Sequence, residues 1–332
     1  MKIVYLVQNP GIASRTPDGW HSAVIVARQD RGYADQDLQE LADADILVVG
    51  LEPVTEALLG RARQLKLVQR LGVGYDNIDL DAAARYGVPV CNMPDFNAAA
   101  VAEHTIMLIL ALLRRVFEST LLMKAGKWPI SAIVAQGIFD LRGKTVGIIG
   151  LGAIGQAVAR RARAFEVSIS YNDRFQHGPA IEEGLGASLV SLDTLLRQSD
   201  IVTCHLPHTV ETHRMIGRPE LLKMKRTAIL INTARGAIVD EEALAEALHQ
   251  GIIAGAGLDV FADEPLDPRH PLRRCPNVLL TPHTAGQTRE AMERMVETML
   301  DNIQRVASGK EPRFRVNPSG RLTPEHPGHR AC

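Results

Sequence analysis

Residues 145–162 constrain the fold of this 332-residue chain more than any other segment. They form an apolar strand, a turn with Gly150, Gly152 and Gly155 in G-x-G-x-x-G spacing, and an alanine-rich helix. The first glycine permits a tight turn, the second lets the backbone approach a pyrophosphate, and the third allows helix and strand to pack closely. The free amides and the positive dipole end of the helix then face the phosphates. A glycine-rich turn can be a simple connection, but this context favours a dinucleotide site.

A second strand follows the turn and ends in Asp173. A carboxylate at this position can accept hydrogen bonds from both ribose hydroxyls of an adenosine, and it repels a 2′-phosphate. The pattern therefore favours NAD as the cofactor. The next residue, Arg174, has a guanidinium that can accommodate a 2′-phosphate, so NADP remains an alternative.

Short apolar, β-branched runs alternate with helical patterns along the chain, which is typical of parallel sheets joined by helical crossovers. The first series of expected strands is 2–7, 46–50, 67–71 and 88–91, with amphipathic helix patterns at 35–45 and 80–87. The second series is 145–150, 168–172, 201–204, 228–232, 255–259 and 278–281. We therefore predict an α/β protein with two doubly wound parallel-sheet domains.

The length of the chain also predicts two domains, because 332 residues exceed what one hydrophobic core usually serves. A long Ala/Leu-rich helix pattern at residues 97–117 would carry the chain from the first lobe to the second. A further helix pattern at residues 288–307 would return it to the first lobe, ahead of a tail rich in proline, glycine and charge. The expected boundaries are 1–100, 101–287 and 288–332.

The composition gives no indication of a nucleic-acid or membrane partner. The 37 basic residues balance the 38 acidic ones, and the longest apolar run, at residues 106–113, is shorter than the roughly 20 residues that cross a bilayer. The four cysteines show no CxxC or ligand-like spacing; they are Cys91, Cys204, Cys275 and Cys332. We expect reduced structural thiols, no metal site and a cytoplasmic location.

Three chemically active side chains lie at or just beyond strand ends of the second series, where open α/β sheets bind ligands. They are Arg235 in ILINTARGAIVDEEAL, Glu264 in GLDVFADEPL and His283 in VLLTPHTAG. Singly they fit a surface ion pair, a solvated loop acid and a strand-end histidine. Together they fit the reduction of a 2-oxo acid, which needs a cation for the carboxylate and an acid for the developing alkoxide. A carboxylate beside a histidine favours its protonated form and fixes its tautomer.

These three motifs resemble the Arg, Glu and His motifs of the D-isomer-specific 2-hydroxyacid dehydrogenases, in the same order and at similar spacing. The resemblance extends to LGVGYDNIDL, NMPDFNAAAVAEH and GIIGLGAIG, and it covers about residues 65–306. It implies a Rossmann NAD-binding domain inserted into a flavodoxin-like substrate domain. It also implies an NAD(P)-dependent oxidoreductase that transfers a hydride between the cofactor and a small D-2-hydroxy or 2-oxo acid.

The resemblance assigns roles to further residues. The three motif residues inherit the catalytic roles, and Arg235 also contacts the substrate. Val73 and Gly74 would present backbone amides to the substrate carboxylate, and Asp259 would hold the nicotinamide carboxamide. Many members carry arginine at the position of Ala153, so its absence predicts weaker cofactor binding. Besides the glycine-rich turn and the ribose acid, the cofactor positions are Ala153, Ile154, Leu206, Pro207, Thr233, Ala234, Asp259 and Gly286.

The choice of substrate depends on few residues. Arg70 aligns with an arginine of phosphoglycerate dehydrogenases that holds a second anionic group, although a strand-end ion pair explains it equally well. The segment after Trp128 lacks basic residues for a phosphate, and we expect no regulatory domain after residue 310. We therefore expect glyoxylate, hydroxypyruvate or another small unphosphorylated 2-oxo acid. Phosphoglycerate dehydrogenase and a nucleotide-sensing, corepressor-like binding protein are the alternatives.

The expected helix at residues 101–113 is apolar around most of its circumference, so it needs cover on more than one side. This pattern predicts a homodimer that forms through that helix.

Overall fold

The computed structural model describes residues 1–7, 10–25, 39–275 and 277–318. The chain divides into two compact units. Unit 1 comprises Met1–Phe96 and Arg289–Cys332, and unit 2 comprises Asn97–Thr288. Unit 2 is therefore inserted between the two segments of unit 1. The chain passes from one unit to the other after Phe96 and after Thr288.

Unit 1 contains a five-stranded parallel sheet of order β2-β1-β3-β4-β5. Its strands are β1 (Lys2–Leu6), β2 (His21–Ile25), β3 (Ile46–Val49), β4 (Leu67–Arg70) and β5 (Val90–Cys91). This order is that of flavodoxin-like sheets. The central strands β3 and β4 are fully buried, which explains their continuous apolar character in sequence. The sequence analysis missed β2, an edge strand that is largely exposed and so carries a weak hydrophobic pattern.

The helices of unit 1 within the described residues are η1 (Pro10–Arg15), α2 (Glu56–Arg61), α3 (Leu80–Arg85) and α12 (Arg289–Ala307). The predicted helix at residues 80–87 is confirmed as α3, whose N-cap Asp79 accepts a hydrogen bond from the Ala82 amide at 2.8 Å. The first part of the predicted helix at 35–45 lies outside the described residues, and residues 40–43 form a turn. Asn302 of α12 donates to the Gln69 side chain of β4 at 2.7 Å, so α12 packs on the sheet.

Unit 2 contains a seven-stranded parallel sheet of order β12-β11-β10-β9-β6-β7-β8. The strands are β6 (Thr145–Ile149), β7 (Ser168–Asn172), β8 (Ala187–Leu189), β9 (Ile201–Cys204), β10 (Ile229–Asn232), β11 (Gly255–Leu258) and β12 (Val278–Leu280). Outward from β6, this is the doubly wound order of dinucleotide-binding sheets with one added strand. The six predicted strands are present within one residue at each end, and β8 was missed because it is short and mostly exposed. The predicted α/β class with two doubly wound parallel sheets is confirmed.

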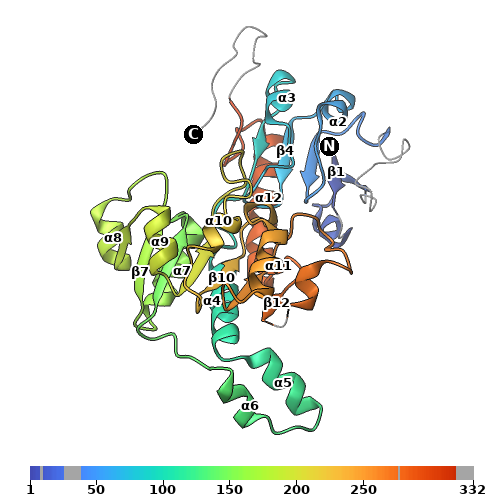
Figure 1. The fold of residues 1–332 in the computed structure, drawn as a ribbon. Helices are drawn as coiled ribbons and strands as arrows, with labels where there is room; N and C mark the ends of the chain where they lie inside the picture. The colour runs from blue at the N-terminus through green and yellow to red at the C-terminus, as the bar shows by residue number, and fades with distance from the viewer. Residues whose placement is uncertain (8–9, 26–38, 276, 319–332) are drawn as a thin grey trace. The chain divides into compact units, whose positions relative to one another are not determined.

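The helix predicted at residues 97–117 is shorter in the structure. The helix ends at Leu113, and Arg115 adopts a left-handed backbone conformation with φ of 49°. Its guanidinium donates to the carbonyls of Gln136 and Gly137 at 3.1 and 3.0 Å, which turns the chain into a separate helix. Figure 1 shows α5 and α6 extending away from the sheet of unit 2. The helices of unit 2 are α4 (Ala98–Leu113), α5 (Val116–Lys124), α6 (Ile130–Ala135), α7 (Ala153–Arg163), α8 (Pro179–Leu185), α9 (Leu192–Gln198), α10 (Arg218–Leu221), η2 (Gly236–Ile238), α11 (Glu241–His249) and η3 (Pro271–Arg274).

Helix α4 packs against α7 and against strands β10 and β11 of its own unit. Most of its apolar side chains are buried there, and Met107 is its one large hydrophobic side chain that is strongly exposed. Its circumference is therefore largely covered within the chain. The apolar composition of α4 no longer argues for a dimer contact through this helix.

None of the described helices is both long and apolar enough to cross a membrane. Among the described cysteines, Cys91, Cys204 and Cys275 are buried and free. Burial raises the pKa of the Cys91 and Cys204 thiols to about 12, so neither is a nucleophile at neutral pH. Cys332 lies outside the described residues.

Candidate active site

The glycine-rich turn joins β6 to α7. Gly150 has φ of 92°, and a Cβ there would lie 2.8 Å from a Leu206 methyl and 2.9 Å from the His205 carbonyl. A Cβ at Gly155 would collide with the Gly150 carbonyl oxygen. At Gly152, by contrast, no heavy atom lies within 4 Å of the Cβ position. Packing thus requires the first and third glycines, and the second leaves open space at the start of α7, which fits a dinucleotide pyrophosphate.

The acid predicted to bind the ribose lies directly beside this turn. Asp173 accepts a hydrogen bond from the Leu151 amide through Oδ2 at 2.7 Å and from the Arg174 amide through Oδ1 at 2.7 Å. The carboxylate is therefore fixed against the turn, and each oxygen keeps acceptor capacity. The Arg174 guanidinium lies 3.4 Å from the Glu211 carboxylate on the exposed surface.

The other predicted cofactor positions of unit 2 follow the carboxyl ends of neighbouring strands, except for two on the first turn of α7. They are Leu206 and Pro207 after β9, Thr233 and Ala234 after β10, Gly286 after β12, and Ala153 and Ile154 on α7. Thr233 is buried, and its hydroxyl lies 3.0 Å from that of Thr105. A Cβ at Gly286 would lie 2.5 Å from the Asn97 side chain. The structure brings these positions to the same edge of one sheet.

Asp259, which follows β11, is fully buried and richly hydrogen-bonded. Its Oδ1 accepts from the Thr281 hydroxyl at 2.6 Å and the Thr284 amide at 2.9 Å, and its Oδ2 accepts from the Ala285 amide at 2.8 Å. His104 Nε2 lies 3.0 Å from the Thr281 hydroxyl and 3.6 Å from Asp259 Oδ1. Neither Thr281 nor His104 was predicted as a site residue, although Thr281 lies in the TPHTAG motif and His104 ends the motif NMPDFNAAAVAEH. Asp259 thus fixes the segment after β12.

That segment carries His283, whose backbone has φ of 54° and whose amide donates to the Asp259 carbonyl at 2.8 Å. His283 Nδ1 lies 2.7 Å from Glu264 Oε2. The other carboxylate oxygen of Glu264 accepts from the Phe261 amide at 3.0 Å, which orients the acid. The histidine ring is held through Nδ1, so Nε2 is the atom left to exchange a proton.

The electrostatics of this pair favour an ionised acid. Burial, the largest single effect, would raise the pKa of Glu264. The hydrogen bond and the charge of His283, the Phe261 amide and the charge of Arg235 act in the opposite direction, and together they lower it. Glu264 is therefore a carboxylate at neutral pH, hydrogen-bonded to the ring of His283.

Arg235 lies between β10 and η2 in an extended backbone conformation, and its Nη1 donates to the Ala234 carbonyl at 2.8 Å. A Cβ at the next residue, Gly236, would collide with the backbone of Phe261 and Ala262. The segment after β10 therefore packs directly on the loop that carries the acid. The three predicted catalytic residues come from the adjacent strands β10, β11 and β12 and lie at their carboxyl ends.

A second carboxylate supports the same loop and was missed from the sequence. Glu241 accepts from the Ala262 amide at 2.6 Å, and its other oxygen lies 3.2 Å from His270 Nε2. Burial, the largest effect, raises the pKa of Glu241. Glu241 therefore positions the residues next to Glu264.

The predicted substrate residues Arg70, Val73 and Gly74 belong to unit 1. Arg70 is 4% exposed and donates from Nη1 to the Leu71 carbonyl at 2.8 Å. The Val73 carbonyl accepts from the Asn92 side chain at 2.8 Å, so residues 71–75 form an anchored loop after β4. The substrate contacts assigned to these residues remain predictions.

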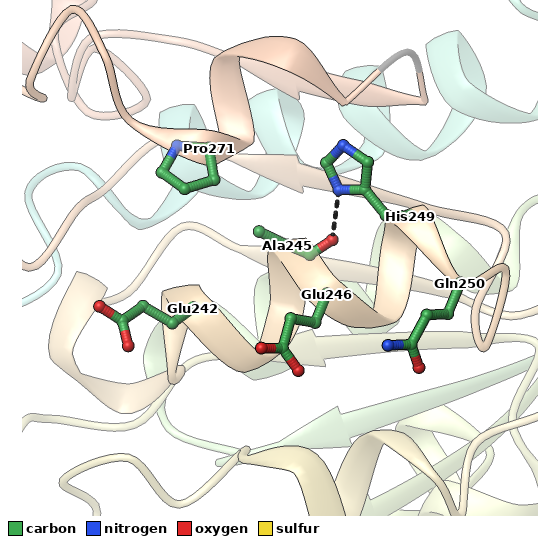
Figure 2. A pocket seen from close by; sticks show the side chains of 6 residues that line it. All are labelled: Glu242, Ala245, Glu246, His249, Gln250 and Pro271. Atoms are coloured by element: carbon green, nitrogen blue, oxygen red, sulfur yellow. Dashed lines mark hydrogen bonds between the residues drawn. The ribbon is translucent and has the colours of Figure 1, made fainter.

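Two further features of unit 2 are not candidates for catalysis. Burial lowers the pKa of His205 to about 3, and its Nε2 lies 2.9 Å from the Thr203 hydroxyl, so this histidine is neutral. Figure 2 shows a hollow of about 370 Å³ on α11, where His249 contacts the Ala245 carbonyl at 2.7 Å. None of the predicted catalytic residues lines it. The described residues also contain no group of three or more side chains suited to a metal ion.

Comparison with known proteins agrees with this site. The family model for "D-isomer specific 2-hydroxyacid dehydrogenase, NAD binding domain" matches residues 106–285. The glyoxylate reductase of Aeropyrum pernix is 45% identical over 286 residues, which cover 84% of this chain and 85% of that protein. The D-3-phosphoglycerate dehydrogenase of Archaeoglobus fulgidus is 40% identical over 281 residues, which cover 84% of this chain and 53% of that protein.

Among solved structures, the NADPH-dependent glyoxylate/hydroxypyruvate reductase of Sinorhizobium meliloti, in complex with NADP and malonate, has a TM-score of 0.82 at 33% identity. The match covers 97% of this chain and 99% of that one. The family model spans more than half of the chain, and the glycine-rich turn, Arg235, Glu264 and His283 lie within it. The chain therefore belongs to the D-isomer specific 2-hydroxyacid dehydrogenases and is an NAD(P)-dependent oxidoreductase, as its motifs predicted.

Proposed function

We propose that this chain reduces glyoxylate and closely related small 2-oxo acids, such as hydroxypyruvate, with NADH. Chiral products have the D configuration. The observation that carries the proposal is the Glu264–His283 pair at 2.7 Å, with the charge of Arg235 acting on the same carboxylate. The names of several relatives that are 41–45% identical, all glyoxylate reductases, supply the substrate class.

Arg235 is the proposed substrate residue of unit 2. Its planar fork binds the substrate carboxylate and polarises the neighbouring carbonyl, which orients the carbonyl carbon for hydride transfer. In unit 1, the family resemblance assigns the binding of a substrate carboxylate to the backbone amides of Val73 and Gly74.

Proton transfer falls to His283. Its Nδ1 is held by Glu264, so Nε2 gives a proton to the developing alkoxide while the carbonyl carbon receives the hydride. The ionised Glu264 stabilises the imidazolium before transfer and fixes the orientation of the ring. In the oxidative direction the neutral His283 takes the hydroxyl proton back.

The cofactor supplies the hydride when NADH is bound. The amides of the glycine-rich turn hold its pyrophosphate, and Asp173 accepts hydrogen bonds from the adenosine ribose. The carboxylate of Asp259 accepts three hydrogen bonds from the protein and has lone pairs left, with which it accepts a hydrogen bond from the nicotinamide carboxamide. The Leu151 and Arg174 amides hold Asp173 beside the turn, where its carboxylate would repel a 2′-phosphate, so we favour NAD over NADP.

Phosphoglycerate dehydrogenase is the second candidate, because Arg70 aligns with an arginine of those enzymes and a relative of that name is 40% identical. Arg70 is buried, however, and it hydrogen-bonds to its own loop. An arginine in that environment is poorly placed to receive a substrate phosphate directly. The unphosphorylated acids therefore remain the favoured substrates.

The test is a reductase assay. Purified protein is mixed with NADH or NADPH and with glyoxylate, hydroxypyruvate, pyruvate, phenylpyruvate or 3-phosphohydroxypyruvate, and the loss of reduced-cofactor absorbance is followed. We expect the highest kcat/KM with glyoxylate or hydroxypyruvate and NADH, and loss of turnover in His283→Ala. Preference for the phosphorylated acid would establish the second candidate. NADH binding without any turnover would favour a nucleotide-sensing binding protein.

The homodimer is also part of this proposal, through a different surface from the one first expected. Helix α5 has 9 residues and buries none of them, and α6 buries only Ile133. Short helices without packing are unstable in water, so this arm needs a partner, and we propose a second copy of the chain. Its exposed apolar side chains are Val116, Phe117, Leu121, Met123, Trp128, Ile130 and Val134.

Light scattering checks this assembly. We expect a dimer mass for the wild-type protein and a monomer mass for a Phe117→Glu, Trp128→Glu double variant. A monomeric wild-type protein would contradict the proposal.

The cytoplasm is the proposed location, because the described cysteines are free and buried. Microscopy of a tagged chain checks this location.

A further inference from the structure

A buried carboxyl in unit 1 has no role in the chemistry described above. Glu52, which follows β3, is 3% exposed, and neither of its carboxylate oxygens has a hydrogen-bond partner among the described residues. A buried ionised group without donors is costly. Its presence therefore calls for a nearby positive charge or for a function.

The positive charge is Arg70 on the neighbouring strand, whose register partner on β3 is Val49. Each side chain lies over a glycine of its own segment. A Cβ at Gly50 would lie 2.6 Å from Glu52 Oε2, and a Cβ at Gly72 would lie 2.9 Å from Arg70 Nη1. Because both positions are glycine, a buried acid and a buried base lie against the backbone at the carboxyl edge of one sheet.

The two groups interact electrostatically. Burial, the largest effect, raises the pKa of Glu52, and the backbone amide of Glu52, the charge of Arg70 and the backbone amide of Gly50 oppose this rise. Both side chains are almost completely removed from solvent, so water screens their charges weakly.

Arg70 also contacts the loop at residues 71–75, because its Nη1 donates to the Leu71 carbonyl at 2.8 Å. The loop is anchored from the other side, where the Met93 amide donates to the Gly72 carbonyl at 3.0 Å and Asn92 donates to the Val73 carbonyl. The guanidinium therefore lies directly against an ordered loop. Its charge acts on whatever anion that loop binds.

We propose that Glu52 is a specificity-determining residue, whose buried carboxylate offsets the charge of Arg70 and so makes the loop at residues 71–75 select 2-oxo acids with one negative charge over those with two. This inference rests on the proposed function, in which Val73 and Gly74 bind the substrate carboxylate. With both charges present, a second anionic group of a substrate meets little net positive charge at this loop. Without the carboxylate, Arg70 attracts that second group.

The test compares glyoxylate with oxaloacetate, an unphosphorylated 2-oxo acid with two carboxylates. We expect Glu52→Gln to raise the ratio of kcat/KM for oxaloacetate to that for glyoxylate by about tenfold, an order-of-magnitude value for one charge in a weakly screened site. Glu56→Gln is the matched control, because it removes a nearby charge that is exposed and paired with Arg85 at 2.8 Å. The control is expected to leave the ratio unchanged. Adding Arg70→Met to Glu52→Gln should abolish the gain.

An unchanged ratio in a folded Glu52→Gln protein would overturn the inference. Selective loss of hydroxypyruvate turnover would also overturn it, because that result indicates a direct contact with a substrate hydroxyl. A readout without turnover separates this inference from the proposed function. The rise in melting temperature on adding malonate should be larger in Glu52→Gln than in the wild-type protein, and an equal rise would count against charge masking even where the reductase assay is silent.

Discussion

Replacing Glu264 by glutamine tests whether the acid beside His283 supports proton transfer. The substitution keeps the size of the side chain and removes its charge. The pair is separated by 2.7 Å, with 31% and 27% of the His283 and Glu264 side chains exposed. Two unit charges near 4 Å interact by roughly 4 kcal/mol at an effective dielectric constant of 20. Partial exposure reduces this value, and a hydrogen bond to a charged group is worth about 1.5–3 kcal/mol.

A loss of that size in the transition state lowers kcat/KM for glyoxylate roughly 10- to 150-fold. The dissociation constant for NADH, measured by fluorescence titration, should change little because Glu264 is not a predicted cofactor contact. Asp263→Asn is the matched control, since it removes an exposed charge from the same loop. A change below threefold in Glu264→Gln, or an equal loss in the control, would refute the proposed role of the pair.

Three further predictions follow from the site. The pKa of Glu264 is lowered in the folded protein from its ordinary value of 4.5, so the ionised carboxylate contributes its full stabilisation above pH 4.5 and loses it as pH falls through the lower folded pKa. The difference in melting temperature between the wild-type protein and Glu264→Gln should therefore shrink below pH 4.5, and a constant difference would contradict the lowered pKa. Asp173→Ser removes the charge expected to repel a 2′-phosphate, so kcat/KM with NADPH should rise relative to NADH, and an unchanged cofactor ratio would argue against this acid as the discriminator. Ala153→Arg places a cation at the open first turn of α7 and should tighten NADH binding several-fold by titration, whereas an unchanged dissociation constant would remove the hypothesis of a phosphate contact at this position.

The features that the sequence predicted well are those with local causes. A strand, a glycine turn and a helix in direct succession identify Gly150 and Gly155, because their backbone conformation and close packing exclude other residues. The continuous apolar character of central parallel strands likewise located the buried strands β6, β9 and β10. The partnership of Glu264 and His283, which are 19 residues apart in the chain, was predicted from their positions at strand ends, and the family resemblance supported it.

The features that the sequence did not predict depend on distant contacts. The end of α4 at Leu113 depends on an arginine that binds carbonyls more than 20 residues away. His104 ends the motif NMPDFNAAAVAEH, but only the fold brings it to the Thr281 hydroxyl 177 residues later. Glu52 lies in an ordinary turn sequence, and its burial depends on how β3 and β4 pair.

The sheet of unit 2 explains why these distant residues meet. All seven strands are parallel, so the segments after β6, β9, β10, β11 and β12 leave from the same edge. Asp259 follows β11, between the strands that precede Arg235 and His283, and its carboxylate accepts the amides of the segment that carries the histidine. The predicted carboxamide contact and the predicted proton donor therefore share one buried anchor. A shift of that anchor would move both groups together, so hydride and proton transfer depend on the same few hydrogen bonds of Asp259.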